Sequence, residues 1–263
     1  MPTSSKPTHD VHQAASDGYA IASKAYARGR PDYPQEISAW LASSLGLRDG
    51  KTVIDLGAGT GKFTRRLIAT GATVIAVEPV AQMLEKLRTE LPSAQALEGS
   101  ATRIPVPDNS VDAVVCAQSF HWFATTQALD EIHRVLKPGG QLGLVWNLRD
   151  DREAWVRQLN AIVDQVEGDA PRYATGAWRR VFPAQGFGPL QEQYFSNMHR
   201  GSAEDVILNR VRSTSFIAAL PEPIRKHIES QVKALIATEP ALREKEIVAM
   251  PYTTAAYNTM KST

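Results

Sequence analysis

Five short, mostly apolar runs separated by stretches with helical spacing constrain the fold of this chain more than any other feature. The runs cover residues 51–56, 73–78, 94–99, 111–118 and 141–146. Runs of this length and composition are typical of strands buried on both faces, as in parallel sheets. The stretches between them place apolar residues three or four positions apart, which predicts amphipathic helices.

The expected helices cover residues 62–71, 79–92 and 125–136, and the sequence KPGG at 137–140 is expected to close the last of them. Strands that alternate with helices predict βαβ units and a doubly wound, mostly parallel α/β sheet with right-handed crossovers. Ligands of such sheets bind at the carboxyl ends of the strands, so the residues that follow the strands are the candidates for function.

Beyond residue 150 the alternation stops. Helical spacing covers 153–166, 202–212 and 222–237, with Ser202 and Asp205 as a capping pair, and strands are expected at 190–198 and 246–260. Residues 150–189 are interpreted either as the remainder of the domain or as a helical cap over the ligand cleft. The predicted organisation is a flexible arm (1–15), an α/β core (16–150), and a cap with the C-terminal strands that complete the same seven-stranded domain (151–263).

Composition narrows the class of protein. The 263 residues are 43% hydrophobic and 22% charged, which is ordinary for a globular domain. With 29 basic and 28 acidic residues, the net charge of +1 gives no electrostatic footprint for nucleic acid or an anionic membrane. The only cysteine, Cys116, excludes a disulfide within the chain and fits a reducing, cytoplasmic location.

Other classes of protein are also disfavoured. No apolar run approaches the roughly 20 residues of a membrane span, and residues 1–18 lack the apolar segment of a secretory signal. The histidines have no ligand-like spacing, so no metal site is expected. The oligomeric state leaves no signal in the sequence.

The sequence DLGAGTGKF at 55–63 follows the first strand and raises the question of its ligand. A P-loop requires GxxxxGK followed by Ser or Thr, but Gly57 and Gly61 are one residue too close and Phe63 replaces the hydroxyl. A dinucleotide loop requires GxGxxG, whereas this loop reads GxGxG. The carboxylate of Asp55 would moreover repel a pyrophosphate.

S-adenosylmethionine fits the loop better, because it carries an ammonium, a carboxylate, a sulfonium and a ribose diol but no phosphate. Glycines let the backbone approach such a ligand, and the following helix N-terminus can serve its carboxylate. Asp55 has the right charge for a cationic ligand. Glu78, at the end of the second strand, can accept both ribose hydroxyls, although NAD would use it equally well.

Four segments in order resemble the class I S-adenosylmethionine-dependent methyltransferases, in particular the small-molecule branch called methyltransferase type 11. They are VIDLGAGTGKF, VIAVEP, GSATRIPVPDNSVDAVVCAQSFHWF and EIHRVLKPGG. The upstream YARGRPDYP (26–34) is similar to the segment that covers the cofactor in the same branch. The resemblance spans roughly residues 19–150.

The resemblance implies a set of cofactor contacts. Asp55, Gly57, Gly59, Gly61 and Gln118 would border the methionine part, and Glu78 would bind the ribose. The adenine would lie between Pro79 and Met83, with Ser100 and Ala101 at its amino edge. Many relatives have an aspartate where this chain has Ser100, so that contact departs from the family pattern. The pocket would be closed from above by Tyr26, Arg30 and Tyr33.

Candidate substrate residues follow the fourth and fifth strands. His121, within SFHWF, is the candidate general base or substrate orienter, because its unperturbed pKa lies near 6.5. Trp122 and Phe123 could line the site and attract a sulfonium. Asn147 and Arg149 follow the fifth strand, and Arg149 could bind a substrate carboxylate. The alternatives are a structural role for His121 among packed rings and a surface ion pair of Arg149 with Asp150 or Asp151.

Three functions remain possible. The favoured one is methyl transfer from S-adenosylmethionine to a small-molecule acceptor. A nucleic-acid methyltransferase is disfavoured by the near-zero net charge and by the strand exit Gln118–His121, which lacks an Asn/Asp-Pro-Pro-aromatic turn. A protein that binds the cofactor without catalysis has the same fold and is the third possibility.

Overall fold

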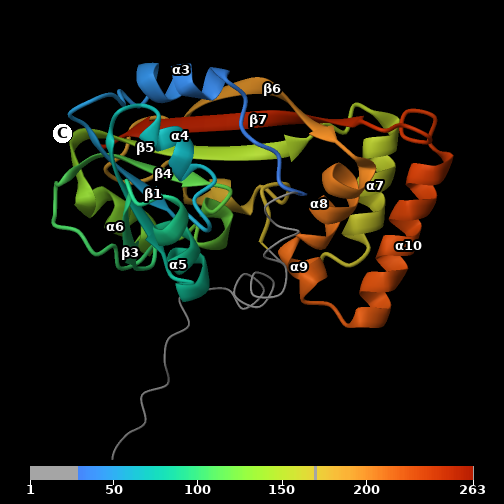
Figure 1. Ribbon diagram of the computed structural model, residues 1–263. Helices are drawn as coiled ribbons and strands as arrows, with labels where there is room; N and C mark the ends of the chain where they lie inside the picture. The colour runs from blue at the N-terminus through green and yellow to red at the C-terminus, as the bar shows by residue number, and fades with distance from the viewer. Residues whose placement is uncertain (1–28, 169–170, 263) are drawn as a thin grey trace, which may run out of the picture.

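Seven strands form one sheet in the order β3-β2-β1-β4-β5-β7-β6 in the computed structural model, which describes residues 29–168 and 171–262 (Figure 1). The strands are β1 (Thr52–Leu56), β2 (Thr73–Glu78), β3 (Gln95–Glu98), β4 (Val111–Ala117), β5 (Leu136–Arg149), β6 (Gln191–Gly201) and β7 (Val248–Met260). Only β7 runs antiparallel to its neighbours in this sheet of the described residues. The predicted doubly wound, mostly parallel, seven-stranded α/β fold is confirmed.

The strand order reverses between β1 and β4, which lie side by side although β2 and β3 separate them in the sequence. From β1 the chain first moves outward through β2 and β3 and then returns to the other side of β1. The loops that leave β1 and β4 therefore diverge to opposite faces, and this divergence opens a crevice at the carboxyl ends of the strands.

Helices cover both faces of the sheet, because successive strand residues point to opposite sides. Val53 and Val74 pack against α3 (Glu36–Ser43) and α4 (Thr64–Ile68), and α5 (Ala81–Glu90) lies on the same face. Ile54 belongs to the opposite core, where it packs with α6 (Thr126–Val135) and the short helix η2 (Ala177–Val181). Both faces of β1 and β2 are therefore buried, as their apolar sequences predict.

Both ends of β5 differ from the sequence prediction. KPGG does not close the helix; it forms the irregular beginning of β5, which starts directly after α6 at Leu136. The pairing register with β4 shifts between Val111 and Ala113 to accommodate the extra residues. Gly139 has a φ of +73°, which a glycine adopts without strain. β5 also continues to Arg149, beyond the predicted end at 146, because β7 pairs with it over that length.

Five helical segments beyond residue 150 gather at one end of the long strands (Figure 1). They are α7 (Ala154–Asp164), the π-helical segment η3 (Glu204–Leu208), α8 (Asn209–Arg212), α9 (Ser215–Ala218) and α10 (Glu222–Thr238), and we call them the helical lobe. Their buried faces form a separate core with the beginning of β7, including Met250 and Tyr252. Of the segment 150–189, α7 belongs to this lobe, whereas Trp178 in η2 packs against the sheet. The role of this segment as a cap stays a prediction.

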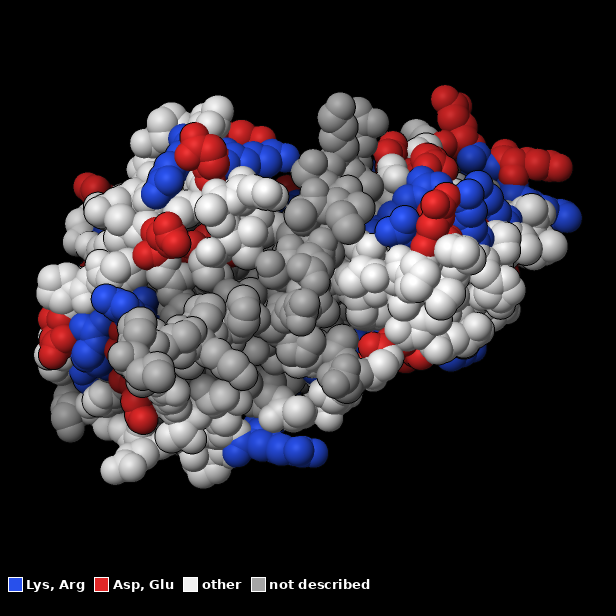
Figure 2. Space-filling model, turned by 90° about the horizontal axis from the view of Figure 1, so that it is seen from below, with Lys and Arg blue, Asp and Glu red and all other residues white. Residues whose placement is uncertain are grey.

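The predicted division at residues 15 and 150 stays a prediction, and the arm 1–15 lies outside the described residues. None of the helices in the described part of the chain has the length and apolarity to cross a membrane. Figure 2 shows one face of the molecule, on which Lys and Arg are interspersed with Asp and Glu, so the described residues form no continuous basic stripe on that face.

Candidate functional site

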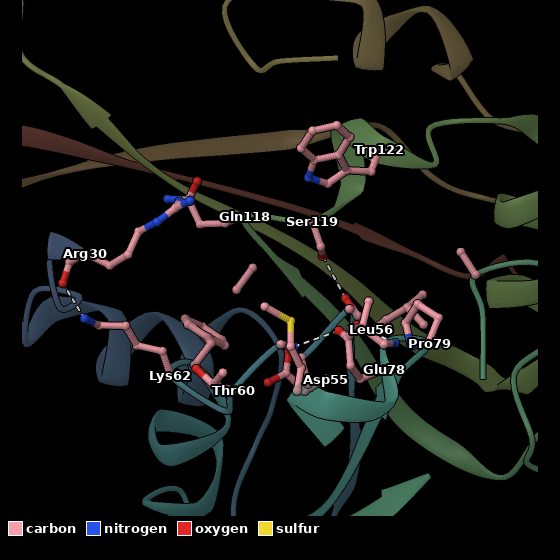
Figure 3. Close-up of a pocket in the computed structure, with 18 of the residues that line it drawn as sticks. Arg30, Asp55, Leu56, Thr60, Lys62, Glu78, Pro79, Gln118, Ser119 and Trp122 are labelled. Carbon is pink, nitrogen blue, oxygen red and sulfur yellow. Dashed lines mark hydrogen bonds between the residues drawn. The ribbon is translucent and has the colours of Figure 1, made fainter. Parts of the chain in front are cut away.

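A pocket opens at the carboxyl ends of β1, β2 and β4, where the strand order reverses. We call it the strand-end pocket. Figure 3 shows Asp55 and Glu78 on its strand side, Gln118 and Trp122 across from them, and Arg30 with Lys62 at one end. The predicted site residues that line it are Arg30, Tyr33, Asp55, Gly57, Gly59, Glu78, Pro79, Met83, Ser100, Ala101, Gln118, Trp122, Phe123 and Asn147. Tyr26 lies outside the described residues.

The glycines of the loop have different roles. A Cβ on Gly57, which has a φ of +72°, would lie 2.7 Å from Cβ of Ser119, so this glycine lets β1 and β4 exit side by side. A Cβ on Gly61, with a φ of +84°, would lie 2.5 Å from Cδ1 of Leu91. Gly61 does not line the strand-end pocket, and the structure assigns it to packing between the loop and α5 rather than to the pocket wall.

The carboxylate of Glu78 accepts hydrogen bonds from two backbone amides next to the pocket. Its side chain is buried, Oε2 accepts a hydrogen bond from the Gly59 amide at 2.8 Å, and Oε1 accepts one from the Val80 amide at 3.0 Å. Burial raises the pKa of Glu78, and the two amide bonds counteract that rise. A carboxylate has about four acceptor sites, so two remain for a ligand in the pocket.

Asp55 presents an acceptor that the described residues do not satisfy. Oδ2 accepts a hydrogen bond from the Thr64 hydroxyl at 2.6 Å, whereas Oδ1 is buried without a hydrogen-bond partner among the described residues. Burial raises the pKa of Asp55 to about 7, with a further contribution from the neighbouring Glu78 charge. A buried acceptor without a donor is unfavourable by roughly 1–3 kcal/mol, so this position favours a ligand that brings a donor, above all a cationic one.

Two basic side chains close one end of the pocket. Lys62 donates a hydrogen bond from Nζ to the backbone oxygen of Arg30, and Nη2 of Arg30 donates one to the backbone oxygen of Ser213 at 3.0 Å. Burial lowers the pKa of Lys62 to about 8, so the ammonium is still mostly protonated at neutral pH. Sequence reasoning missed Lys62, although its position directly after the last glycine was a usable signal.

A second cavity of about 390 Å³ adjoins the strand-end pocket, and the two share the wall residues Arg30, Gln118, Trp122, Asn147 and Arg210. We call it the arginine cavity, because Arg149, Arg172 and Arg210 line it together with Arg30. Predicted site residues His121 and Arg149 face this cavity and not the strand-end pocket. No motif or spacing in the sequence pointed to Arg172 or Arg210.

His121 is held as a neutral imidazole. Trp146 donates a hydrogen bond from Nε1 to Nδ1 of His121 at 3.0 Å, and an indole N–H can only donate. The proton of the imidazole must therefore be on Nε2. Burial, with the nearby charges of Arg30 and Arg172, lowers the pKa of His121 to about 3. A general base works best with a pKa near the operating pH, so the geometry does not favour that role for His121.

Gln118 stands where the two cavities meet. Its φ of +59° is uncommon for a residue with a side chain, and its amide donates a hydrogen bond to the Asn147 backbone oxygen at 3.3 Å. Such strained conformations concentrate at binding sites, where the surrounding structure holds them in place.

The side chain of Asn147 is already engaged with the protein. Its Oδ1 accepts hydrogen bonds from Thr254 and Asn197, and its amide donates to the Asp32 backbone oxygen. Asn147 therefore ties the segment before α3 to the sheet. Its contacts fit the positioning of the pocket wall.

Within the described residues, no three His, Cys, Asp or Glu side chains come together in a way that could hold a metal ion. Two adjoining cavities therefore form the candidate site. Asp55 and Glu78 line the strand-end pocket, and arginines line the arginine cavity.

Residues 54–144 match the family model described as a methyltransferase domain. An uncharacterized methyltransferase-like protein of Schizosaccharomyces pombe is 38% identical over 90% of this chain and 92% of its own length. An uncharacterized methyltransferase of Mycobacterium tuberculosis is 42% identical over 88% and 90%. Among solved structures, a phosphoethanolamine N-methyltransferase of Haemonchus contortus, in complex with S-adenosylhomocysteine, has a TM-score of 0.57 at 14% identity, covering 98% of this chain and 61% of that one.

Proposed function

The chain belongs to the class I S-adenosylmethionine-dependent methyltransferase family, and we propose that it transfers the methyl group of S-adenosylmethionine to a small molecule. The observation that carries the proposal is the charge arrangement of the strand-end pocket. A buried carboxylate with an unsatisfied oxygen, Asp55, lies beside Glu78, while Lys62 closes one end. This arrangement fits a ligand with an ammonium, a diol and a carboxylate, and it opposes a pyrophosphate on the carboxylate side.

S-adenosylmethionine supplies a methyl group on a positively charged sulfur, which is already an excellent leaving group. Glu78 is proposed to accept the ribose hydroxyls with the acceptor sites that the loop amides leave free. Asp55 would accept a hydrogen bond from the ligand ammonium through Oδ1, and Lys62 would pair with the ligand carboxylate. Each of these contacts joins a group on the ligand to a complementary side chain that the pocket already positions.

The adenine contacts are proposed for the opposite end of the pocket. Pro79 and Met83 offer apolar surfaces on either side of a flat ring, and Ser100 with Ala101 offers polar groups at its edge. Ser100 makes a hydrogen bond of 3.2 Å with the Thr102 hydroxyl, so its own hydroxyl is already oriented within the turn. The Ala101 amide is the more available adenine partner.

The protein's part in the reaction is alignment and the exclusion of water. Trp122 and Phe123 line the strand-end pocket, and Trp122 also lines the arginine cavity. Aromatic rings attract a sulfonium by roughly 0.5–2 kcal/mol. The strained backbone of Gln118 would hold the boundary between donor and acceptor. The neutral His121 would orient the acceptor as a hydrogen-bond donor through Nε2.

The size and the walls of the arginine cavity support a small acceptor. Its walls come from the sheet, from η1 (Phe120–Trp122) and from the helical lobe, so a bound molecule would contact several elements of the protein. A nucleic-acid methyltransferase would need a basic surface that tracks phosphates, and the balanced charge of the chain argues against one.

The test is the release of S-adenosylhomocysteine during incubation with S-adenosylmethionine and pooled small acids, phenols and amines, or with DNA or RNA. We expect release with one of the small-molecule pools and none with nucleic acid. Release that depends on nucleic acid would contradict the proposal. The Glu78→Gln variant should abolish the signal at low cofactor concentration.

A further inference from the structure

Arginines from three separate parts of the chain face the arginine cavity. Arg149 ends β5, Arg172 follows α7, and Arg210 lies in α8 of the helical lobe. Arg210 also lines the strand-end pocket, so positive charge extends to the boundary between the two cavities. A convergence of this kind requires the lobe to be folded against the sheet.

Among the described residues, two of these arginines lack a carboxylate partner. Arg149 donates to the neutral Asn160 side chain at 2.8 Å, and Arg210 donates to the Thr214 hydroxyl at 3.1 Å. Nε of Arg210 is buried without a hydrogen-bond partner among the described residues. No ion pair within 4.0 Å joins either guanidinium to an Asp or Glu in the described part of the chain.

The carboxylates near the arginine cavity either pair with Arg172 or are exposed to solvent. Asp164 and Glu167 both pair with Arg172, and Asp164 accepts from it at 3.0 Å. Asp151 is the one carboxylate among the described residues lining the cavity, and it is exposed. The charge of the cavity is therefore strongly positive before any ligand binds.

The burial of these two arginines is unfavourable for the protein without a bound anion. Burial, together with the charge of Arg30, lowers the pKa of Arg210 to about 9, so this guanidinium remains charged at neutral pH. Burial also lowers the pKa of Arg149. Buried charges without partners are a common sign of a site whose partner is a ligand.

Four aromatic side chains also line the cavity. Trp122, Trp146, Tyr173 and Phe216 line it, and the Arg172 guanidinium lies 5.6 Å from the centre of the Phe216 ring. A fitting ligand therefore combines an anionic group with an apolar body. A planar guanidinium can bind a carboxylate through two parallel hydrogen bonds, which gives orientation as well as affinity.

We propose that the methyl acceptor is a small organic acid whose carboxylate binds Arg149 and Arg210 while its apolar body lies against the aromatic walls. This inference rests on the proposed function, because it identifies the arginine cavity as the acceptor site of the same reaction. The shared wall at Gln118 and Trp122 is where the acceptor meets the methyl donor.

The experiment measures binding to the full chain by calorimetry, first alone and then saturated with S-adenosylhomocysteine. The probes are matched pairs: benzoate and benzamide, cinnamate and cinnamamide, hexanoate and hexanamide, with phenyl phosphate as the other anion. We expect at least one carboxylate to bind ten-fold or more tightly than its amide. No carboxylate preferred over its amide, or phenyl phosphate bound more tightly than every carboxylate, would overturn the inference.

The two proposals fail separately in this design. If S-adenosylhomocysteine binds but the acids and amides are not distinguished, the inference about the acceptor fails and the cofactor assignment stands. If S-adenosylhomocysteine does not bind while a carboxylate does, the arginine cavity is an acid site and the methyl-transfer proposal fails.

Variants separate a binding role from a structural one. Arg149→Gln and Arg210→Gln should each weaken carboxylate binding at least ten-fold, and their unfolding temperatures should equal or exceed that of the parent. Arg180→Gln, at an exposed arginine of η2, is the matched control and should change neither quantity. Variants that unfold at lower temperature yet bind the acid normally would assign these arginines to stability instead.

Discussion

Nε1 of Trp146 and Nδ1 of His121 are joined by a hydrogen bond of 3.0 Å that fixes the tautomer of the imidazole. Protonation of His121 at Nδ1 would replace this bond with two opposed N–H groups. Because burial and two arginines act in the same direction, the pKa of His121 falls to about 3. His121 therefore behaves as a fixed polar group in the wall of the arginine cavity.

His121 should remain neutral across the physiological range. Its imidazole resonances, followed by NMR, should not titrate between pH 8 and 5. In Trp146→Phe, which removes the donor, the pKa of His121 should rise. A midpoint for His121 near 6.5 in the parent protein would contradict this account.

The same pKa shift affects stability. The folded pKa of His121 lies below the unfolded value near 6.5, so the unfolded state binds more protons between about pH 3 and 6.5. The contribution of His121 to the free energy of unfolding is therefore fully present above pH 6.5 and decreases as the pH falls toward 3.

Asp55 should make cofactor binding depend on pH near neutrality. A cationic ligand group favours the ionised carboxylate, whose pKa in the free protein is about 7. Affinity for S-adenosylmethionine should rise roughly ten-fold between pH 5.5 and 7, and binding at pH 7 should release protons to the buffer. Calorimetry in buffers of different ionisation enthalpy measures that release, and Asp55→Asn should remove it. An unchanged proton release in this variant would exclude Asp55 as its source.

The contribution of Asp55 to folding stability decreases as the pH rises, whereas the affinity for the cofactor should increase. Its folded pKa lies above the unfolded value of about 3.8, so the folded state retains a proton that the unfolded state has lost. This contribution to stability is fully present below about pH 4 and is lost as the pH rises through 7. The difference in unfolding free energy between Asp55→Asn and the parent should follow this window.

Lys62 should act on the amino-acid part of the cofactor alone. Lys62→Met is expected to weaken S-adenosylhomocysteine about ten-fold or more, because a charge-assisted hydrogen bond is worth roughly 1.5–3 kcal/mol. 5′-Methylthioadenosine has the ribose and adenine but no carboxylate, so its affinity should hardly change. The control is Lys86→Met on α5, outside the pocket walls. Equal losses for both ligands would show that Lys62 supports the loop rather than the carboxylate.

The left-handed backbone of Gln118 should make the folded protein less stable than a glycine at this position would. Left-handed backbone is unfavourable by roughly 1–2 kcal/mol for residues with a Cβ, so Gln118→Gly should unfold at the same or a higher temperature. Ala117→Gly, one residue earlier in β4, should lose roughly 0.5–1 kcal/mol. Turnover should fall in Gln118→Gly because the amide contact with Asn147 is lost. If both variants lose the same stability, the conformation of Gln118 is not strained.

The sequence predicted the parts of the site that depend on local pattern. Asp55 and Glu78 stand directly after strands whose apolar runs are unmistakable, so their arrival at one edge follows from the parallel topology. The glycine spacing of the loop is likewise a local property. Gly61 differs because its requirement is set by Leu91, thirty positions later, which no pattern at the loop reveals.

The residues of the arginine cavity could not be predicted in the same way. Arg210 reaches the boundary of both cavities from a helix of the lobe, far from the motifs in the sequence. The state of His121 depends on its burial and on Trp146, which belongs to another strand. KPGG resembles a helix stop, but pairing with β4 draws it into β5. In each case a tertiary contact decides what the local sequence leaves open.

The most direct test of the central proposal is calorimetric titration of the protein with S-adenosylmethionine, S-adenosylhomocysteine and NAD in parallel, for the parent, Glu78→Gln and a Glu98→Gln control at the end of β3. The account predicts micromolar binding of the first two ligands and none of NAD. It also predicts a loss of about ten-fold or more in Glu78→Gln alone. Binding of NAD without either sulfur ligand, or sulfur-ligand affinities that Glu78→Gln leaves unchanged, would contradict the assignment of the strand-end pocket.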